Sequence, residues 1–188
     1  MLFPNTDAMA HSPPVYTPET LPDAQSLYRS LLEAVRDLIS TLPSDRVHLV
    51  GIHSGGAWLA ERLHQDLNLS QPFGTLDISF YRDDFDRIGL HSQVQPSDIP
   101  FDVVNKHLIL VDDVLYTGRT IRAAMNELFD YGRPASIALA VLLDRGGRQL
   151  PIAASATGAI VLPAPDGNIV LSRDDSGTFV LDIEPKDA

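Results

Sequence analysis

The sequence predicts an α/β protein built on a mostly parallel sheet that is flanked by helices. Residues 47–52, 108–111 and 137–143 are continuous apolar runs with the length of strands buried on both faces. Stretches with the apolar spacing of amphipathic helices stand between these runs. Polar, glycine-containing loops follow the first two runs. Alternation of this kind is typical of a parallel sheet that its own crossover helices cover.

The chain begins with a proline-rich stretch. It lacks the compact apolar core of a secretory signal, so we expect residues 1–20 to form a disordered tail ahead of a single domain at 21–188. Thr20 to Asp23 fits a helix capping box with Pro22 in the first turn. The helix should then run toward Pro43, because its apolar residues keep helical spacing: Leu27, Leu31, Ala34, Val35, Leu38 and Leu42.

A strand-to-helix unit is predicted at residues 47–67. The strand at 47–52 leads through the loop His53-Ser54-Gly55-Gly56 into a helix whose apolar side holds Trp58, Leu59, Ala60, Leu63 and Leu67. The loop lacks the Gly-Lys-Thr/Ser end of a Walker loop. Ile52 also stands where a hydrolase nucleophile elbow requires glycine, which argues against a hydrolase built on His53 and Ser54.

Three further segments complete the predicted fold. Leu76, Ile78 and Phe80 alternate with polar residues, which indicates a half-buried strand, and residues 81–100 then form a long loop. A hairpin is expected over residues 168–183, turning at 174–177. The helix that opens at 117–120 and stops at Gly132 and Pro134 has apolar residues at Ile121, Ala124, Met125, Leu128 and Phe129.

The chemistry is concentrated at residues 108–120. The apolar run ends in Asp112 and Asp113, and Thr117-Gly118-Arg119-Thr120 then opens the helix. Free amides at a helix N-terminus, with two hydroxyls beside them, favour a phosphate dianion. The paired carboxylates suit the vicinal hydroxyls of a ribose and can help to hold Mg²⁺. A polar strand-to-helix turn with an N-cap is the alternative, but the four features occur in register, which favours a functional site.

Composition excludes several classes of protein. The formal net charge of −11 argues against broad affinity for nucleic acid or anionic membranes. There is no cysteine, which rules out disulfides and thiolate metal sites and is compatible with the cytoplasm. No apolar run approaches the ~20 residues that a membrane span requires. The six histidines show no metal-ligand spacing.

Residues 108–120 resemble the phosphoribosyl-diphosphate (PRPP) signature of the type I phosphoribosyltransferase family. The stretch Val111 to Ala124 is most similar to the PyrR-type members, which regulate the pyrimidine operon and are also uracil phosphoribosyltransferases. The likeness covers roughly residues 20–155. Its supporting segments are Gly51-Ile52 with the loop after it, Leu76-Asp77-Ile78 with Tyr81-Arg82-Asp83-Asp84, and Leu143 to Ile152.

The resemblance implies a role for each segment. Asp112 and Asp113 would contact the ribose hydroxyls and Mg²⁺, and residues Val114, Leu115, Tyr116, Thr117, Gly118, Arg119 and Thr120 would form the PRPP site, with 117–120 on the 5-phosphate. The loop His53, Ser54, Gly55 and Gly56 would hold pyrophosphate. The loop at Tyr81, Arg82, Asp83 and Asp84 would close over the substrate, and a small C-terminal hood, roughly residues 144–188 with N-terminal contributions, would read the base.

Several positions depart from the family pattern. PyrR-type proteins more commonly have Thr-Arg-Gly where this chain has Ser54-Gly55-Gly56, so a basic side chain is missing near the pyrophosphate. Their hood usually contains Val-Gly-Lys-Asn-Ile-Pro-Thr, and residues 157–163 lack the Lys and the Asn. Tyr116 replaces the aspartate that usually serves the ring in 6-oxopurine members, which argues against a purine substrate.

The implied activity is transfer of the phosphoribosyl group from PRPP to uracil, giving UMP and pyrophosphate, combined with UMP- or UTP-responsive binding of an RNA leader by a homo-oligomer. Two alternatives remain open: a nucleotide-sensing RNA-binding regulator with weak catalysis, and a phosphoribosyltransferase for another base. Between residues 119 and 148 five arginines face three acids, a small excess that a solvated face also explains: Arg119, Arg122, Arg133, Arg145 and Arg148 against Glu127, Asp130 and Asp144.

Overall fold

The computed structural model describes residues 12–78, 96–162 and 166–184 as a six-stranded parallel sheet, a separate two-stranded hairpin and helices packed on the sheet. The helices are α1 (Ala24–Ser40), α2 (Gly55–Asp66) and α3 (Arg119–Tyr131), with short 3-10 helices η1 (Pro18–Thr20) and η2 (Ser44–Arg46). The strands are β1 (Val15–Tyr16), β2 (Val47–Ile52), β3 (Gly74–Leu76), β4 (His107–Leu115), β5 (Ser136–Asp144), β6 (Ala156–Val161), β7 (Asn168–Arg173) and β8 (Phe179–Glu184).

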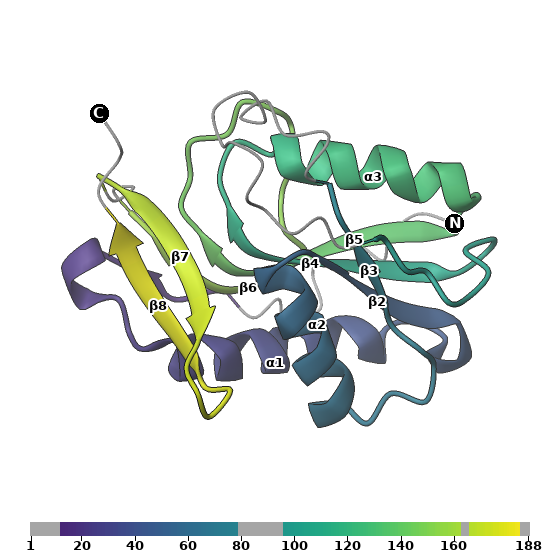
Figure 1. Ribbon diagram of the computed structural model, residues 1–188, viewed down its shortest axis with the longest axis horizontal. Coiled ribbons are helices and arrows are strands. Elements are labelled where there is room, and N and C mark those ends of the chain that lie inside the picture. The colour runs from purple at the N-terminus through teal and green to yellow at the C-terminus, as the bar shows by residue number, and fades with distance from the viewer. Residues whose placement is uncertain (1–11, 79–95, 163–165, 185–188) are drawn as a thin grey trace.

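The main sheet has the strand order β1-β6-β5-β4-β2-β3, and all its pairs are parallel. Successive strand residues point to opposite faces. On β4, Ile109 and Val111 join the core beneath α1 and α2, whereas Leu108 and Leu110 join the core beneath α3. Figure 1 shows this layering, with α1 and α2 on one face of the sheet and α3 on the other. The predicted α/β class is therefore confirmed.

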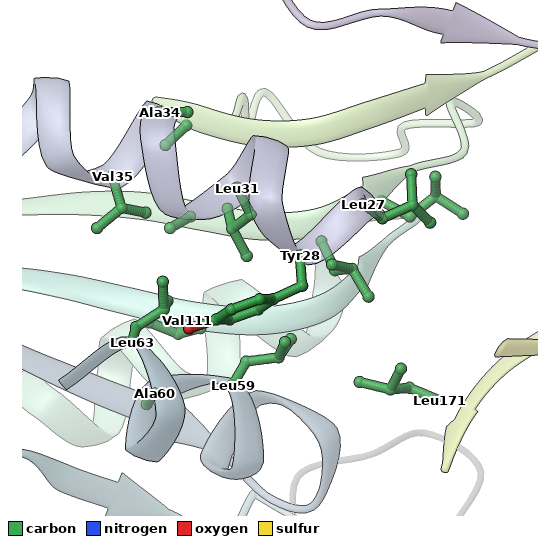
Figure 2. Packing of buried hydrophobic residues seen from close by; sticks show 14 of the residues in the cluster. Leu27, Tyr28, Leu31, Ala34, Val35, Leu59, Ala60, Leu63, Val111 and Leu171 are labelled. Carbon is green, nitrogen blue, oxygen red and sulfur yellow. The ribbon is translucent and has the colours of Figure 1, made fainter. Parts of the chain in front are cut away.

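Helix α1 begins at a different cap from the one expected. Asp23 is the N-cap, and its carboxylate accepts hydrogen bonds from the amides of Gln25 and Ser26 at 2.9 and 3.0 Å. The capping box instead joins Thr17 and Thr20 around η1, so the predicted box at Thr20 is wrong and Pro22 precedes the helix. The apolar face of α1 is nevertheless as predicted. In Figure 2 the Tyr28 ring lies between α1 and α2, over the strands.

Four predictions from the sequence change in the structure. Residues 12–20 contain β1 and η1, so the part of the expected tail that the structure describes is ordered; residues 1–11 lie outside the described residues. The third strand covers only 74–76, with Ile78 buried beyond it and Phe80 outside the described range. Strand β6, which we assigned to the hood region, belongs to the main sheet. Phe129 points outward and is 50% exposed.

The C-terminal hairpin lies at the predicted residues. Strands β7 and β8 pair from Asn168↔Glu184 to Arg173↔Phe179. Ile169, Leu171 and Phe179 pack into the core beneath α1 and α2, which fixes the hairpin to the domain. In Figure 1 the hairpin stands at one end of the molecule, across from α2. Within the described ranges, no helix combines the length and apolar character that a bilayer span requires.

Candidate functional site

A cavity of about 770 Å³ lies where the ends of β2 and β4 meet the hairpin. Three parts of the chain form its wall, together with Arg145 after β5. They are the start of α2 with the loop before it, the end of β4 with the loop into α3, and strand β7. The lining residues are His53, Ser54, Gly55, Trp58, Asp112–Ile121, Arg145 and Asn168–Leu171.

The end of β4 brings two carboxylates to this cavity. Strand β4 continues through the acids to Leu115, because Val114 and Leu115 still pair with Leu143 and Asp144 of β5. Asp112 is buried, and one of its oxygens accepts the amide of Asp113 at 3.1 Å. One Asp113 oxygen accepts the amide of Val114 at 2.8 Å. Strand pairing therefore fixes the backbone that carries both acids, while the two side chains line the cavity.

The first turn of α2 lies directly against β4. A β-carbon on Gly55 would fall 2.4 Å from an Asp113 carboxylate oxygen, and one on Gly56 would fall 2.3 Å from the Val111 carbonyl oxygen. Only glycine permits this approach at either position. The peptide between His53 and Ser54 is cis. The side chain of the N-cap residue Ser54 makes no cap hydrogen bond, and the start of α2 is a place where backbone amides can bind an anion in the cavity.

The loop before α3 also leads into a helix start on the cavity wall. Gly118, the N-cap, has φ +90°, a left-handed conformation that favours glycine, and contributes no side-chain cap. The Thr117 hydroxyl oxygen accepts the amide of Arg119 at 3.3 Å. The Thr117 carbonyl accepts the amides of Gln149 and Leu150 at 3.0 and 3.2 Å. The segment after β5 therefore holds the main chain of this loop in place on the cavity wall.

Two arginines hold the same loop from behind. Arg148 donates to the carbonyl of Tyr116 at 2.7 Å and to that of Ile152 at 3.0 Å, and it forms an ion pair with Asp144. Arg145 is a buried residue, only 5% exposed, and its guanidinium lies 4.4 Å from the centre of the Tyr116 ring. These two of the five arginines noted in the sequence therefore serve the site's internal structure.

The sequence matches the family model described as the phosphoribosyl transferase domain over residues 19–170, which is most of the chain. The chain belongs to the phosphoribosyl transferase domain family. It is 50% identical over 156 residues to the bifunctional protein PyrR of Nitrosococcus oceani, covering 82% of this chain and 88% of the relative. It is 48% identical over 169 residues to the bifunctional protein PyrR of Ralstonia nicotianae, covering 88% and 97% of the two chains.

Solved phosphoribosyltransferases share the fold at much lower identity. The hypoxanthine-guanine phosphoribosyltransferase of Leishmania tarentolae in complex with GMP superposes with a TM-score of 0.62 at 16% identity, covering 91% of this chain and 98% of that one. The hypoxanthine phosphoribosyltransferase of Trypanosoma cruzi gives 0.60 at 19% identity, covering 88% and 96%. These structures support the phosphoribosyltransferase fold.

Most of the residues that the sequence suggested for this phosphoribosyltransferase site line one cavity. His53, Ser54, Gly55 and residues 112–120 do so, whereas Gly56 is buried behind the wall, against β4. The loop at Tyr81, Arg82, Asp83 and Asp84 lies outside the described residues. Sequence reasoning missed Trp58 and residues 168–171, which carry no chemical motif and reach the cavity only through the fold.

The glycine at position 55 has a structural explanation in this phosphoribosyltransferase. The PyrR-type pattern would place arginine there, yet any β-carbon at Gly55 would displace the Asp113 carboxylate. The position of Asp113 therefore requires glycine at residue 55, and this requirement excludes a basic side chain there. Arg119 and the buried Arg145 are the arginines among the described residues that line the cavity.

The acid pair can hold a metal ion only in part. In the described ranges, no three His, Cys, Asp or Glu side chains are grouped as a metal site. Among the described residues that line the cavity, Asp112 and Asp113 are the ones that supply carboxylate oxygens. Mg²⁺ prefers such oxygens, usually keeps several waters and is commonly shared with substrate phosphates. The residues therefore fit a magnesium ion that arrives with a diphosphate, which phosphoribosyltransferases generally use.

Proposed function

We propose that this protein transfers the phosphoribosyl group of PRPP to uracil, giving UMP and pyrophosphate, and that it also regulates pyrimidine genes. One observation carries the catalytic half: the starts of two helices and an acid pair line the same cavity. PRPP carries two anionic groups, one at each end of a ribose, and so matches that pattern. The relatives named bifunctional protein PyrR support the regulatory half.

The 5-phosphate of PRPP is assigned to residues 117–120. The left-handed Gly118 is the N-cap of α3 and carries no side chain, so a phosphate can approach the backbone amides at this helix start closely. The Thr117 and Thr120 hydroxyls line the same wall and add donors. Because a nucleotide product has the same 5-phosphate, PRPP and UMP would share this subsite.

The diphosphate is assigned to the loop at residues 53–56. The first amides of α2 supply donors, and the positive end of the helix favours a dianion. Asp112 and Asp113 line the same cavity as this loop and residues 117–120, and we assign the ribose hydroxyls to these two acids. Magnesium bound with PRPP would use the same acids and would neutralise the leaving diphosphate.

The base is assigned to the wall formed by β7. Ile169, Val170 and Leu171 provide apolar surface, and the main chain there is fixed by pairing with β8. Among the described residues that line the cavity, Asn168 alone has a carboxamide. A carboxamide can donate and accept at once, as the imide edge of uracil requires. Asn168 therefore takes the role that the missing hood Lys and Asn would have filled.

Catalysis would depend on position and charge. Displacement of pyrophosphate by N1 of uracil passes through a cationic, oxocarbenium-like transition state, which the Asp112 and Asp113 carboxylates stabilise. The rigid end of β4 holds these carboxylates, which limits the reorganisation needed during the reaction. The N1–C1′ bond forms as the C1′–O bond to diphosphate breaks, and the N1 proton passes to solvent, so the scheme requires no side chain as a general base.

A nucleotide-sensing regulator with weak catalysis is the second candidate. It is favoured by Gly55, which leaves the diphosphate loop without a basic side chain. The arginine excess gives less support than the sequence suggested, since Arg145 and Arg148 are engaged around residue 116 and only Arg119, Arg122 and Arg133 are exposed. An RNA-binding surface would therefore need to combine more than one copy of the chain.

Pyrophosphate release with Mg²⁺ and PRPP tests the proposal, with uracil, hypoxanthine, xanthine and orotate assayed in parallel. Release with uracil alone is expected. Release with another base would identify that base, in place of uracil, as the substrate. No release with any base, combined with measurable binding of UMP or UTP, would favour the second candidate.

A further inference from the structure

Arg173, at the end of β7, joins the hairpin to α2. Its guanidinium donates to the carbonyl oxygen of Trp58 at 3.0 Å and pairs with the Glu61 carboxylate at 3.1 Å. It also lies 5.2 Å from the centre of the Trp58 ring and 5.5 Å from that of Phe179. One side chain of the hairpin thus contacts the backbone, a charge and an aromatic ring of the first two turns of α2.

Both elements that this link joins, α2 and β7, contribute residues to the cavity wall. Trp58 lines the cavity from the first turn of α2, the helix that starts in the diphosphate loop. Arg173 ends the strand whose residues 168–171 line the opposite part of the wall. The separation between these two parts sets the space that a base has on entering. Arg173 is therefore placed to determine that separation.

The hairpin has other anchors that maintain its fold. Ile169, Leu171 and Phe179 are buried in the core beneath α1 and α2. Arg62 lies 4.2 Å from the centre of the Tyr28 ring and 5.2 Å from that of Phe179, which holds the β8 side of the hairpin. Loss of Arg173 should consequently loosen the β7 edge without unfolding the hairpin.

We propose that Arg173 is a positioning residue, which keeps β7 and the first turn of α2 together so that the base wall and the diphosphate loop move as one unit. The proposal rests on the proposed function for the identity of the two ligands. Its physical basis is independent of it. Arginine suits the role because one of its terminal nitrogens, Nη2, bonds both a carbonyl and a carboxylate while the planar guanidinium lies near an aromatic ring.

Tryptophan fluorescence tests the link without any substrate. Trp58 is the chain's only tryptophan, so the emission reports the surroundings of this one side chain, which include Arg173. In Arg173→Gln we expect emission at longer wavelength and stronger acrylamide quenching than in wild type. Arg173→Lys keeps the charge but loses the planar guanidinium, so its emission wavelength and quenching should lie between those of wild type and Arg173→Gln. Glu61→Gln serves as a second variant that keeps the bond to the Trp58 carbonyl.

Steady-state kinetics then tests the consequence. Arg173→Gln should raise KM for the base about fivefold, with KM for PRPP and kcat within about twofold, because one exposed charge-assisted link contributes about that factor. Arg46→Gln is the matched control, since Arg46 forms an exposed ion pair with Asp45 before β2, at the other end of that strand from the cavity.

The outcomes separate the two proposals. Unchanged Trp58 emission and unchanged base KM in Arg173→Gln would overturn the positioning role, as would equal damage to both KM values and kcat. If wild type releases no pyrophosphate with any base, the proposed catalysis fails. The emission comparison, repeated with UMP as the probe ligand, would still decide on Arg173.

Discussion

Gly55 and Asp113 are in contact across the base of the cavity, so closely that a β-carbon on Gly55 would fall 2.4 Å from a carboxylate oxygen of Asp113. The next nearest atoms, Asp113 Cγ and Cβ, would lie at 2.7 and 2.9 Å. Asp113 Oδ1 accepts the amide of Val114, which limits how the side chain can turn away. The first residue of α2 therefore determines where an acid of β4 can be.

We predict that Gly55→Ala lowers kcat/KM about 100-fold, because a carboxylate displaced by about 1 Å loses that much of its effect on the transition state. Asp113→Asn should lower it by at least about 100-fold through loss of the charge. Both effects pass through the same side chain. The double variant should therefore be no more than about threefold worse than Asp113→Asn alone, as measured by pyrophosphate release.

Asp130→Asn is the control for this series, since Asp130 is an exposed acid of α3 outside the cavity wall. Thermal melts should show that all variants remain folded. Fully multiplicative losses in the double variant would mean that Gly55 acts independently of Asp113. A wild-type kcat/KM in Asp113→Asn would remove the acids from the mechanism.

Thr117→Ala should weaken the binding of PRPP and UMP by similar factors, about fivefold each, because both ligands present a 5-phosphate to one hydroxyl. Isothermal titration calorimetry measures the two affinities directly. The main chain of the loop should keep its shape, since it is the Thr117 carbonyl that accepts the amides of Gln149 and Leu150. Equal affinities in wild type and variant would contradict the assignment of the 5-phosphate to this loop.

Asn168→Ala should raise KM for uracil about tenfold while leaving PRPP affinity within about twofold, because an imide edge deprived of its partner loses a polar contact in a partly buried site. The strand should persist, since Asn168 pairs with Glu184 through the backbone. Parallel assays with uracil and PRPP as the varied substrate provide the comparison. Similar changes in both KM values would show that Asn168 supports the cavity as a whole.

The stability of the domain should fall as the pH is lowered through the range below about 6.5, the ordinary pKa of histidine. Burial lowers the pKa of His48, which stacks on Phe101 at 3.9 Å between ring centres and contacts the Pro72 carbonyl oxygen through Nδ1 at 2.9 Å. The carbonyl contact opposes that shift, and nearby Lys106 adds to it. Between the folded and unfolded pKa values the unfolded chain binds the extra proton, so acid favours unfolding.

His48→Phe tests this origin of the pH dependence. It keeps an aromatic ring against Phe101 and removes the titrating group, together with Nε2, which is buried and has no hydrogen-bond partner among the described residues. The drop in Tm from pH 7.5 to 5.5 should be smaller in the variant. An identical drop would assign the dependence to other groups.

Long, continuous patterns in the sequence predicted the fold well. The runs at 47–52 and 137–143 became β2 and β5, and the hairpin turns where its polar cluster stands. Strand β6 was missed because Gly158 interrupts its apolar character; a β-carbon there would lie 2.5 and 2.8 Å from the carbonyl oxygens of Leu142 and Leu27. Close packing of α1 on the sheet required that glycine, and no local pattern reveals a requirement set by a distant helix.

The site was predictable to the extent that its residues adjoin a strand end. The loops after β2 and β4 line the cavity because parallel neighbours end at the same edge of the sheet. Trp58 and β7 were not predictable, since an apolar residue on a helix and a hairpin strand are indistinguishable from core. The capping role of Asp23 was missed because Thr20 offers an equally good local pattern three residues earlier.

Strand β1 joins the outer edge of the sheet by pairing Val15 and Tyr16 with Ile160 and Val161, near the other end of the chain. During synthesis this edge can be closed only after β6 has left the ribosome, so β1 waits as an unpaired segment while the central strands assemble. From the time β6 emerges until β1 pairs with it, β6 presents a free row of backbone donors and acceptors to other nascent chains. Deleting residues 1–17 would remove β1 and leave the β6 edge permanently unpaired. We expect such a domain to fold but to aggregate.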